Sequence, residues 1–363
     1  MPVPSQTNLH YRQLAFELGD GDRGRMLSGW QCENPFVGSL LEAVRVSSSE
    51  TDFRNYIYFD ADELLAEKIR RLHLGLDGVT PPAALAGAGA SPLISTFVAW
   101  LAETGVRRVH FIPPLYHTLS TGLARYGIEL VPVAEHQTFE SDFDLRLPDG
   151  SSVLLLSDPI WYAGVAVPEE VLAAVRNWQE RTGSIVFVDG SLQYLPWVGA
   201  RHEHTAALVP DLTIRLISPC KQLAVNGYRF AYLVAPSRHE AALAWIYANL
   251  FGPASAESVV FAHAAVEAVD AGVISAALTE LAAARFNSIV EQGQVTPGPM
   301  PSLGYYAFVR LSSDLSIEGP TMDGRFFDQP RFVGYTKINL LSPAFPNVFD
   351  STAVDYSILH GSS

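Results

Sequence analysis

The run Ile185-Val186-Phe187-Val188-Asp189 decides the fold, because it is a continuous apolar stretch that ends on a single carboxylate. Such runs are typical of strands that are buried on both faces of a parallel sheet. Two segments with a basic side chain follow, Ser218-Pro219-Cys220-Lys221 and Gly227-Tyr228-Arg229-Phe230. An acid, an amine and a guanidinium thus come in order, each beside a strand-like stretch.

Short apolar runs rich in β-branched residues recur through the middle of the chain and alternate with helical patterns. Strands are expected at 108–112, 128–133, 153–156, 185–189, 213–217 and 230–234, and helices at 95–104, 118–126 and 168–182. This alternation predicts an α/β domain with a mostly parallel sheet. Ligands bind such sheets at the carboxyl ends of the strands, where Asp158, Asp189 and Lys221 are expected to lie.

The three groups have complementary chemistry. Lys221 can form an imine with an aldehyde once it loses its proton, and Arg229 can pair with a phosphate. A carboxylate at Asp189, placed on a pyridine nitrogen, would keep that ring cationic and able to withdraw electrons from a carbanion. Together they predict a site for pyridoxal 5′-phosphate.

A glycine-rich segment at 86–91 precedes a helical pattern that starts near Pro92. Backbone N–H groups at the start of a helix bind anions, so the segment is a candidate phosphate cradle. The alternative is a tight turn between a strand and a helix. Its position before Asp189 and Lys221 favours the cradle.

Composition limits the function classes. The chain has 363 residues, of which 48% are hydrophobic and 17% charged, as expected for a globular protein with a large core. A net charge of -14 with no block of Lys or Arg argues against nucleic acid as a partner. Two cysteines, Cys32 and Cys220, argue against a disulfide framework and for the cytoplasm. No apolar run is expected to span a membrane.

Taken in order, these motifs make the chain resemble the fold type I pyridoxal-phosphate enzymes of the aminotransferase class I/II family over about residues 25 to 345. The resemblance implies an aspartate aminotransferase-like α/β fold, with a mostly parallel seven-stranded sheet in a large domain and a smaller α+β domain. It divides the chain into an N-terminal arm at 1–45, a large cofactor-binding domain at 46–240, and an interdomain helix with a small domain at 241–363.

The resemblance also implies roles for site residues. Lys221 forms the Schiff base, Asp189 contacts the ring nitrogen, and Tyr116 stacks on the ring. A second set of residues binds the phosphate of the cofactor, namely Gly89, Ala90, Ser91, Ser218 and Arg229. A tyrosine from the neighbouring subunit, Tyr58 or alternatively Tyr56, completes the site, which implies a homodimer with shared active sites.

Two departures from the family pattern concern the phenolic oxygen of the cofactor. Trp161 stands where the family has an asparagine that contacts this oxygen, and Leu192 stands where it has a tyrosine. Gln193 and Tyr194 are only nearby. Losing two donors should shift the pKa of the imine and the favoured site of the carbanion.

A third departure concerns the substrate. Lys337 stands where the family has an arginine that clamps the substrate carboxylate, and a lysine is a point charge rather than a planar fork. Gly29 is a place where substrate can approach the backbone. We therefore expect an amino acid or an amino-acid conjugate as substrate, and we favour β-elimination of a cysteine S-conjugate or oxidative deamination coupled to decarboxylation.

The N-terminal arm is similar to that of specialised-metabolism members of the family, including the lincosamide-pathway enzymes that process cysteine S-conjugates. This likeness implies a role in antibiotic or other secondary metabolism. An ordinary aminotransferase is the alternative, and a non-catalytic binding protein of the same fold is a second one.

Several residues allow two interpretations. Cys220 is either a nucleophile or a core residue, and His117 either contacts substrate or lies at the surface of a helix start. Trp161 and Tyr162 either line the site or fill the core. The segment 202–204, with sequence His-Glu-His, has a metal-like spacing but no third ligand, so no metal is expected.

Overall fold

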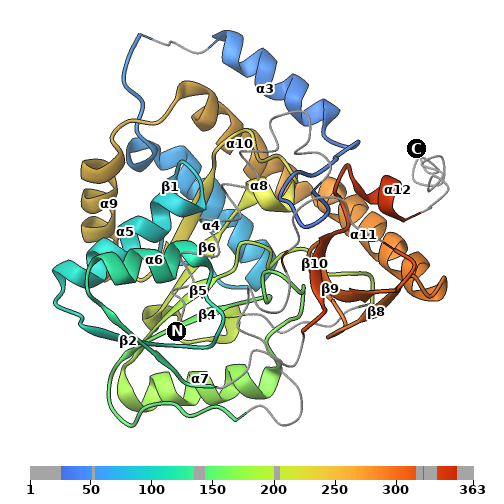
Figure 1. Cartoon of the computed structure of the whole chain (residues 1–363). Coiled ribbons are helices and arrows are strands. Elements are labelled where there is room, and N and C mark those ends of the chain that lie inside the picture. Colours follow the sequence, from blue (N-terminus) through green and yellow to red (C-terminus); the bar gives the residue numbers. More distant parts are fainter. Residues whose placement is uncertain are drawn as a thin grey trace.

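The fold consists of two sheets with helices around them. A computed structural model describes residues 26–50, 54–134, 144–199, 205–315, 322 and 333–349. It contains one seven-stranded sheet and one three-stranded sheet. Figure 1 shows the smaller sheet at one side of the larger, with a long helix, α11 (Val273–Glu291), beside it. The fold class predicted from the sequence is confirmed.

The large sheet is mostly parallel. Its strands are β1 (Ala83–Gly87), β2 (Arg108–Phe111), β3 (Glu129–Pro132), β4 (Val153–Ser157), β5 (Ile185–Asp189), β6 (Thr213–Ile217) and β7 (Ala231–Ala235), in the order β1-β7-β6-β5-β4-β2-β3. All neighbours from β3 to β6 are parallel, whereas β7 runs antiparallel to both β1 and β6. β1 was not predicted, because its sequence Ala-Ala-Leu-Ala-Gly is poor in the residues that favour strands.

Helices cover both faces of this sheet. The helices of the described residues are α3 (Gly38–Glu50), α4 (Glu63–Asp77), α5 (Ala90–Glu103), α6 (His117–Arg125), α7 (Glu169–Thr182), α8 (Pro219–Gln222), α9 (Ser237–Phe251), α10 (Ala256–Ala271), and, beside the small sheet, α11 and α12 (Phe345–Val348). On β5, Phe187 packs on Phe97 of α5 with ring centroids 4.2 Å apart, while Val186 belongs to the cluster that contains Trp178 of α7. Successive side chains of a strand point to opposite faces, so both faces need apolar residues.

The small sheet holds the N-terminal segment in place. It pairs β8 (Val295–Pro297), β9 (Tyr306–Leu311) and β10 (Thr336–Asn339) in antiparallel order β10-β9-β8. The N–H group of Asn339 donates to the carbonyl of Leu27 at 2.8 Å, and its side chain donates to the carbonyl of Gln31 at 2.8 Å. These bonds lay the segment that starts at Met26 along β10. The predicted boundary at 240 falls between the strands of the two sheets, and both boundaries, at 45 and 240, remain predictions.

One helix of the described ranges, α11, is long and apolar enough to cross a membrane by length and composition alone. That is weak evidence, because the core helix of a globular protein passes the same test. Leu278, Ala282 and Phe286 of this helix are buried in the main hydrophobic cluster. Its apolar composition is therefore explained by packing within the fold.

A buried polar network ties α4 to the large sheet. Asp77, at the end of α4, accepts hydrogen bonds from Tyr194 at 2.6 Å, from His73 at 2.8 Å and from Arg215 of β6 at 2.5 Å. Burial would raise the pKa of the Asp77 carboxyl, but the His73 hydrogen bond and the Arg215 charge outweigh it and hold that pKa well below its usual range. Arg215 also donates to the Tyr194 hydroxyl at 2.7 Å.

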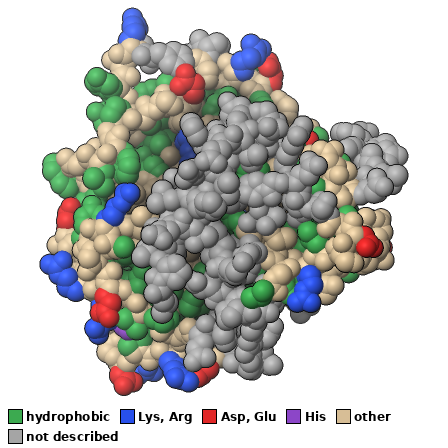
Figure 2. Space-filling view, viewed as in Figure 1, with side chains coloured by type: hydrophobic (Ala, Val, Ile, Leu, Met, Phe, Trp, Pro, Cys, Tyr) green, Lys and Arg blue, Asp and Glu red, His purple; other side chains and the backbone are tan. Residues whose placement is uncertain are grey.

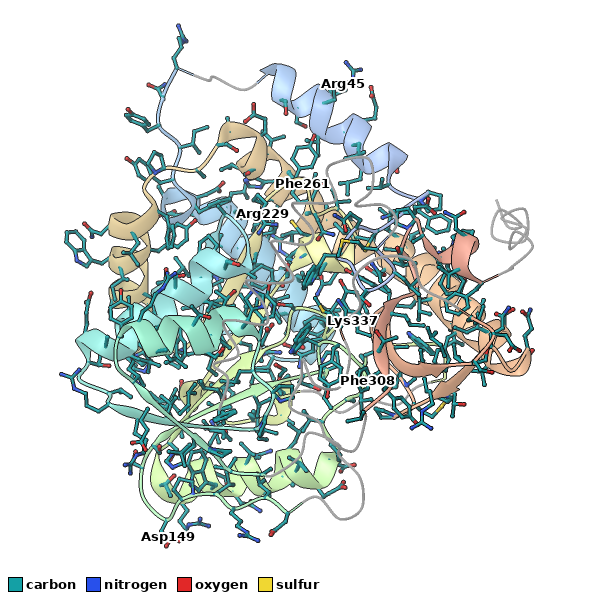
Figure 3. All side chains as sticks on the ribbon, in the orientation of Figure 1. Arg45, Asp149, Arg229, Phe261, Phe308 and Lys337 are labelled. Atoms are coloured by element: carbon teal, nitrogen blue, oxygen red, sulfur yellow. The ribbon has the colours of Figure 1, made fainter. Side chains whose placement is uncertain are left out.

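Removing the acid of this network should destabilise the fold. We expect Asp77→Ala to lower the free energy of unfolding by about 3–5 kcal/mol, because it leaves Arg215 as an uncompensated buried charge. Urea denaturation measures the change. Arg45→Ala is the matched control, since Arg45 pairs with Glu42 on the outer surface of α3 and should have little effect (Figure 3). Equal stability of the two variants would contradict the prediction.

Candidate functional site

A cavity of about 530 Å³ lies where β5 and β6 end, which is within the usual range of about 300–1,000 Å³ for small-molecule sites. Its wall combines loops that follow strands of the large sheet with β9 and the N-terminal segment. The lining residues are Trp30, Gln31, Gly89, Ala90, Ser91, Tyr116, His117, Trp161, Asp189, Ser191, Leu192, Ser218, Cys220, Lys221, Asn226, Arg229, Phe230 and Tyr306.

Most residues that the sequence singled out meet in this cavity. The predicted set that lines it is Gly89, Ala90, Ser91, Tyr116, Trp161, Asp189, Ser218, Lys221 and Arg229. These residues are distant in sequence, and they converge because parallel strands end at the same edge of the sheet. Tyr58, Gly29 and Lys337 do not line it.

One end of the cavity is an anion cradle. Gly89 precedes α5 with a φ of 93°, and within the described ranges no side chain caps the first turn of that helix. The guanidinium of Arg229 lies so close that a Cβ at Gly89 would be 2.8 Å from its Nη2. Free N–H groups at Ala90 and Ser91 thus face the same space as a fixed cation. The arrangement suits a phosphate group.

A methyl group at Gly89 should close this cradle. We expect Gly89→Ala to weaken the binding of inorganic phosphate about tenfold or more, because displacing Arg229 removes a charged hydrogen bond of about 1.5–3 kcal/mol. Titration calorimetry measures the affinity. Gly105→Ala is the control, since Gly105 also has a positive φ, of 80°, but has open space around its Cβ position. Equal phosphate affinity in the two variants would contradict the cradle.

The other end carries Asp189 and Lys221. Asp189 ends β5 and is 6% exposed, and burial raises the pKa of its carboxyl against the hydrogen bonds of Ser191 and the charge of Lys221. Burial lowers the pKa of the Lys221 amine, and Arg229 lowers it further. The environment therefore favours a neutral, nucleophilic amine at Lys221.

Lys337 lies behind the cavity wall. Its side chain is fully buried on β10, and its Nζ donates to the carbonyl of Ser28 at 3.3 Å. The same Nζ lies 3.9 Å from the ring centroid of Tyr306, 4.6 Å from that of Trp30 and 5.7 Å from that of Trp161. Burial, together with the charge of Lys221, holds the pKa of the Lys337 amine well below its usual range. Its contact with a substrate carboxylate stays a prediction.

Figure 3 shows Lys337 on the side of the small sheet that faces the large one, and Arg229 nearer the helices above it. The two cations thus mark different ends of the site. Arg229 belongs to the anion cradle, whereas Lys337 is separated from the cavity by aromatic rings.

Gly29 and the two tyrosines have other surroundings. A Cβ at Gly29 would be 2.9 Å from the carbonyl oxygen of Met26, so this glycine allows the tight turn from Met26 to Gly29. Tyr56 is 83% exposed and Tyr58 is 38% exposed, on the surface before α4. The role of Tyr58 in a neighbouring subunit stays a prediction.

The departures from the family pattern take definite positions. Trp161 lines the cavity and meets Tyr116 edge to face at 5.6 Å, and Leu192 lines it as well. Gln193 instead donates to Asp158 at 3.0 Å, and Tyr194 belongs to the Asp77 network. Neither therefore replaces the donors lost at Trp161 and Leu192.

The residues with two interpretations divide as follows. Cys220 lines the cavity, yet its thiol donates to the carbonyl of Tyr228 at 2.8 Å, and burial raises its pKa to about 11, so it is a poor nucleophile. His117 lines the cavity at the start of α6, and Tyr162 packs against Phe308. In the described ranges no three side chains form a metal site, and residues 202–204 lie outside those ranges.

Sequence reasoning missed several lining residues, namely Ser191, Asn226, Phe230 and Tyr306. Ser191, two residues after Asp189, could have been found, since serine there can bond back to the carboxylate. Asn226 lies between Lys221 and Arg229 and so carried a positional signal. Tyr306 carried none, because its place depends on how β9 packs against the large sheet.

Solved structures share this fold. N-Succinyldiaminopimelate aminotransferase from Mycobacterium tuberculosis matches with a TM-score of 0.75 and 17% identity over 94% of each chain. Substrate-bound BacF from Bacillus subtilis matches with a TM-score of 0.75 and 15% identity over 94% of this chain and 93% of its own.

An aspartate aminotransferase from Thermotoga maritima matches with a TM-score of 0.74 and 14% identity over 96% of each chain. No protein-family model matches the sequence, and no curated protein does. Likeness at such low identity concerns the fold alone. The chain has the aspartate aminotransferase-like form of the fold type I α/β architecture.

Proposed function

We propose that this protein is a pyridoxal-phosphate-dependent enzyme. The observation that carries the proposal is the meeting of Asp189, Lys221 and Arg229 with the first turn of α5 in one cavity. The first turn of α5 and the guanidinium of Arg229, which lies too close to Gly89 for a Cβ there, would together bind a phosphate group. An amine and a carboxylate at the other end match the aldehyde and the ring nitrogen of the cofactor.

When bound, pyridoxal phosphate supplies an aldehyde for the substrate amine and a ring that withdraws electrons from the adjacent carbon. The protein does the rest. Arg229, Ser218 and the α5 turn would hold the phosphate, and Tyr116 would pack on the ring. Asp189 would stabilise a proton on the ring nitrogen. Lys221, whose amine is kept neutral by burial, would take up and return a proton at the substrate carbon through Nζ.

Covalent attachment of the cofactor at Lys221 tests this proposal. We expect the purified protein with pyridoxal phosphate to show the absorbance band of an imine at the edge of the visible range. After borohydride reduction, the peptide that contains Lys221 should be heavier by the mass of the reduced cofactor. Lys221→Ala should abolish both signals, because the amine that forms the imine is gone. Lys68→Ala is the control, since Lys68 pairs with Glu267 at the surface. A band that persists in Lys221→Ala would contradict the proposal.

We further infer that the substrate is an amino acid or an amino-acid conjugate and that the reaction departs from simple transamination. The supporting observation is that Lys337, which stands where the family has a carboxylate-binding arginine, is fully buried behind Trp30 and Tyr306 and does not line the cavity. A looser hold on the carboxylate weakens control over which bond breaks. Trp161 and Leu192 add the loss of two polar contacts.

Two reactions are favoured, β-elimination from a cysteine S-conjugate and oxidative deamination coupled to decarboxylation. A place in antibiotic or other secondary metabolism, including the likeness to lincosamide-pathway enzymes, rests on the resemblance of the sequence alone. Ordinary transamination is equally compatible with the fold. A non-catalytic binding protein is the remaining alternative, but it would have no use for a buried, reactive lysine.

The need for an amino acceptor separates these reactions. With a panel of amino acids and cysteine S-conjugates, we expect turnover without a 2-oxo acid. Pyruvate and ammonia would indicate elimination, and carbon dioxide or peroxide that requires oxygen would indicate oxidative deamination. Accumulation of an aminated cofactor that only a 2-oxo acid reverses would contradict this prediction and favour an aminotransferase. No change with any amine would favour a binding protein.

We also propose a homodimer in which Tyr58 reaches the phosphate of the partner's site. Figure 2 shows hydrophobic side chains gathered at the upper left, where Figure 1 places α9 and the segment before α4. This segment is held against the end of α9 by a bridge between Ile57 and Ala254. Its exposed hydrophobic residues are Tyr56 and Tyr58, and those of α9 are Trp245, Leu250 and Phe251. Exposed aromatic surfaces of this kind suit a protein partner.

We place the enzyme in the cytoplasm, because Cys32 and Cys220 are both free thiols and a reducing compartment keeps them so. The division of the chain at 45 and 240 belongs to the same proposal. It agrees with the position of the seven strands between 83 and 235 and of the three strands after 295.

A further inference from the structure

Asp189 is a buried acid that needs hydrogen-bond donors to stay ionised. Its side chain is 6% exposed, and moving a carboxylate out of water favours the neutral form. Within the described residues no ion pair is formed by Asp189, and hydrogen bonds reach it from one residue, Ser191. The protonation of this acid therefore depends on Ser191 more than on any other described neighbour.

Both of these hydrogen bonds end on the same oxygen. The Ser191 hydroxyl donates to Oδ1 at 2.6 Å, and the Ser191 backbone N–H donates to Oδ1 at 3.2 Å. In the part of the chain that the structure describes, Oδ2 receives no hydrogen bond. Asp189 and Ser191 both line the cavity. Oδ2 is thus the acceptor that remains for a donor entering that space.

The local sequence Asp189-Gly190-Ser191 explains this geometry. Gly190 donates its N–H to the carbonyl of Leu216 at 2.9 Å, and a Cβ on Gly190 would lie 3.1 Å from that carbonyl oxygen. The backbone therefore turns tightly against β6 directly after the acid. The turn brings Ser191, two residues after the acid, back to the Asp189 carboxylate. Short polar side chains commonly make such hydrogen bonds to groups two residues away in turns.

We propose that Ser191 is a positioning residue that holds Asp189 as a carboxylate, with Oδ2 presented to a protonated ring nitrogen in the cavity. The inference rests on the proposed function, because the ring is that of pyridoxal phosphate. It assigns a role to a residue that sequence reasoning passed over. Ser191 itself touches no reacting atom and acts through Asp189.

The test compares three variants of the full chain loaded with pyridoxal phosphate that carries ¹⁵N in its ring. In the unmodified protein the ¹⁵N chemical shift should report a protonated ring nitrogen at pH 8. Ser191→Ala should move this shift toward that of a neutral pyridine and weaken cofactor binding about tenfold to a hundredfold, as expected for the loss of a hydrogen bond to a charged group. Ser191→Thr keeps the hydroxyl and should restore both.

Ser218→Ala is the matched control, because Ser218 also lines the cavity and is assigned to the phosphate by the proposed function. It should weaken binding and leave the ¹⁵N shift unchanged. A Ser191→Ala protein with an unaltered ¹⁵N shift would overturn the inference and leave the proposed function intact. If this variant does not fold, Ser191→Cys replaces the hydroxyl by a weak donor of similar size and gives the same comparison. A protein that takes up no cofactor at Lys221 would instead overturn the proposed function.

Discussion

The register of β4, β5 and β6 holds the site together. Ser157 pairs with Asp189, and Asp189 pairs with Leu216, one residue before β6 ends. Lys221 follows on α8, and its backbone N–H group donates to the carbonyl of Ser218. A shift of one residue in β5 would turn Asp189 to the other face of the sheet. The apolar clusters on both faces prevent that shift, so the packing of the core fixes the distance between acid and amine.

Burial of charge gives the site its reactivity. Asp189 at the end of β5 and Lys337 on β10 are buried, and Lys221 is partly buried at the cavity wall. Desolvation favours the neutral form of each, while mutual attraction between Asp189 and Lys221 opposes it. Arg229 supplies a planar guanidinium, which suits pairing with a phosphate. Arg229 therefore serves to bind the phosphate. Asp189 and Lys221, at the other end, can change their protonation and so serve the reaction.

The sequence was sufficient for the central strands and for the groups at their ends, because parallel strands bury continuous apolar runs and end at a common edge. It was insufficient for β1, where alanines fill a narrow space and carry no strand signal. It was also insufficient for Lys337. Its place in the family pattern suggested a contact with the substrate carboxylate, whereas the rings around it come from Trp30 in the N-terminal segment and Tyr306 on β9. Such contacts between distant segments leave no periodic trace.

Tyr306 shows how the small sheet enters the chemistry. Its ring centroid lies 5.9 Å from the Nζ of Lys221 and 3.9 Å from the Nζ of Lys337, so one side chain of β9 screens both amines. The hydrogen bond from Asn339 to Leu27 fastens the adjacent strand to the segment that supplies Trp30. The packing of the small sheet on the large one therefore controls the access of water to both amines. Through this desolvation it also controls how readily Lys221 gives up its proton. The three-stranded sheet thus acts on the reacting lysine through desolvation, although the lysine itself belongs to the other sheet.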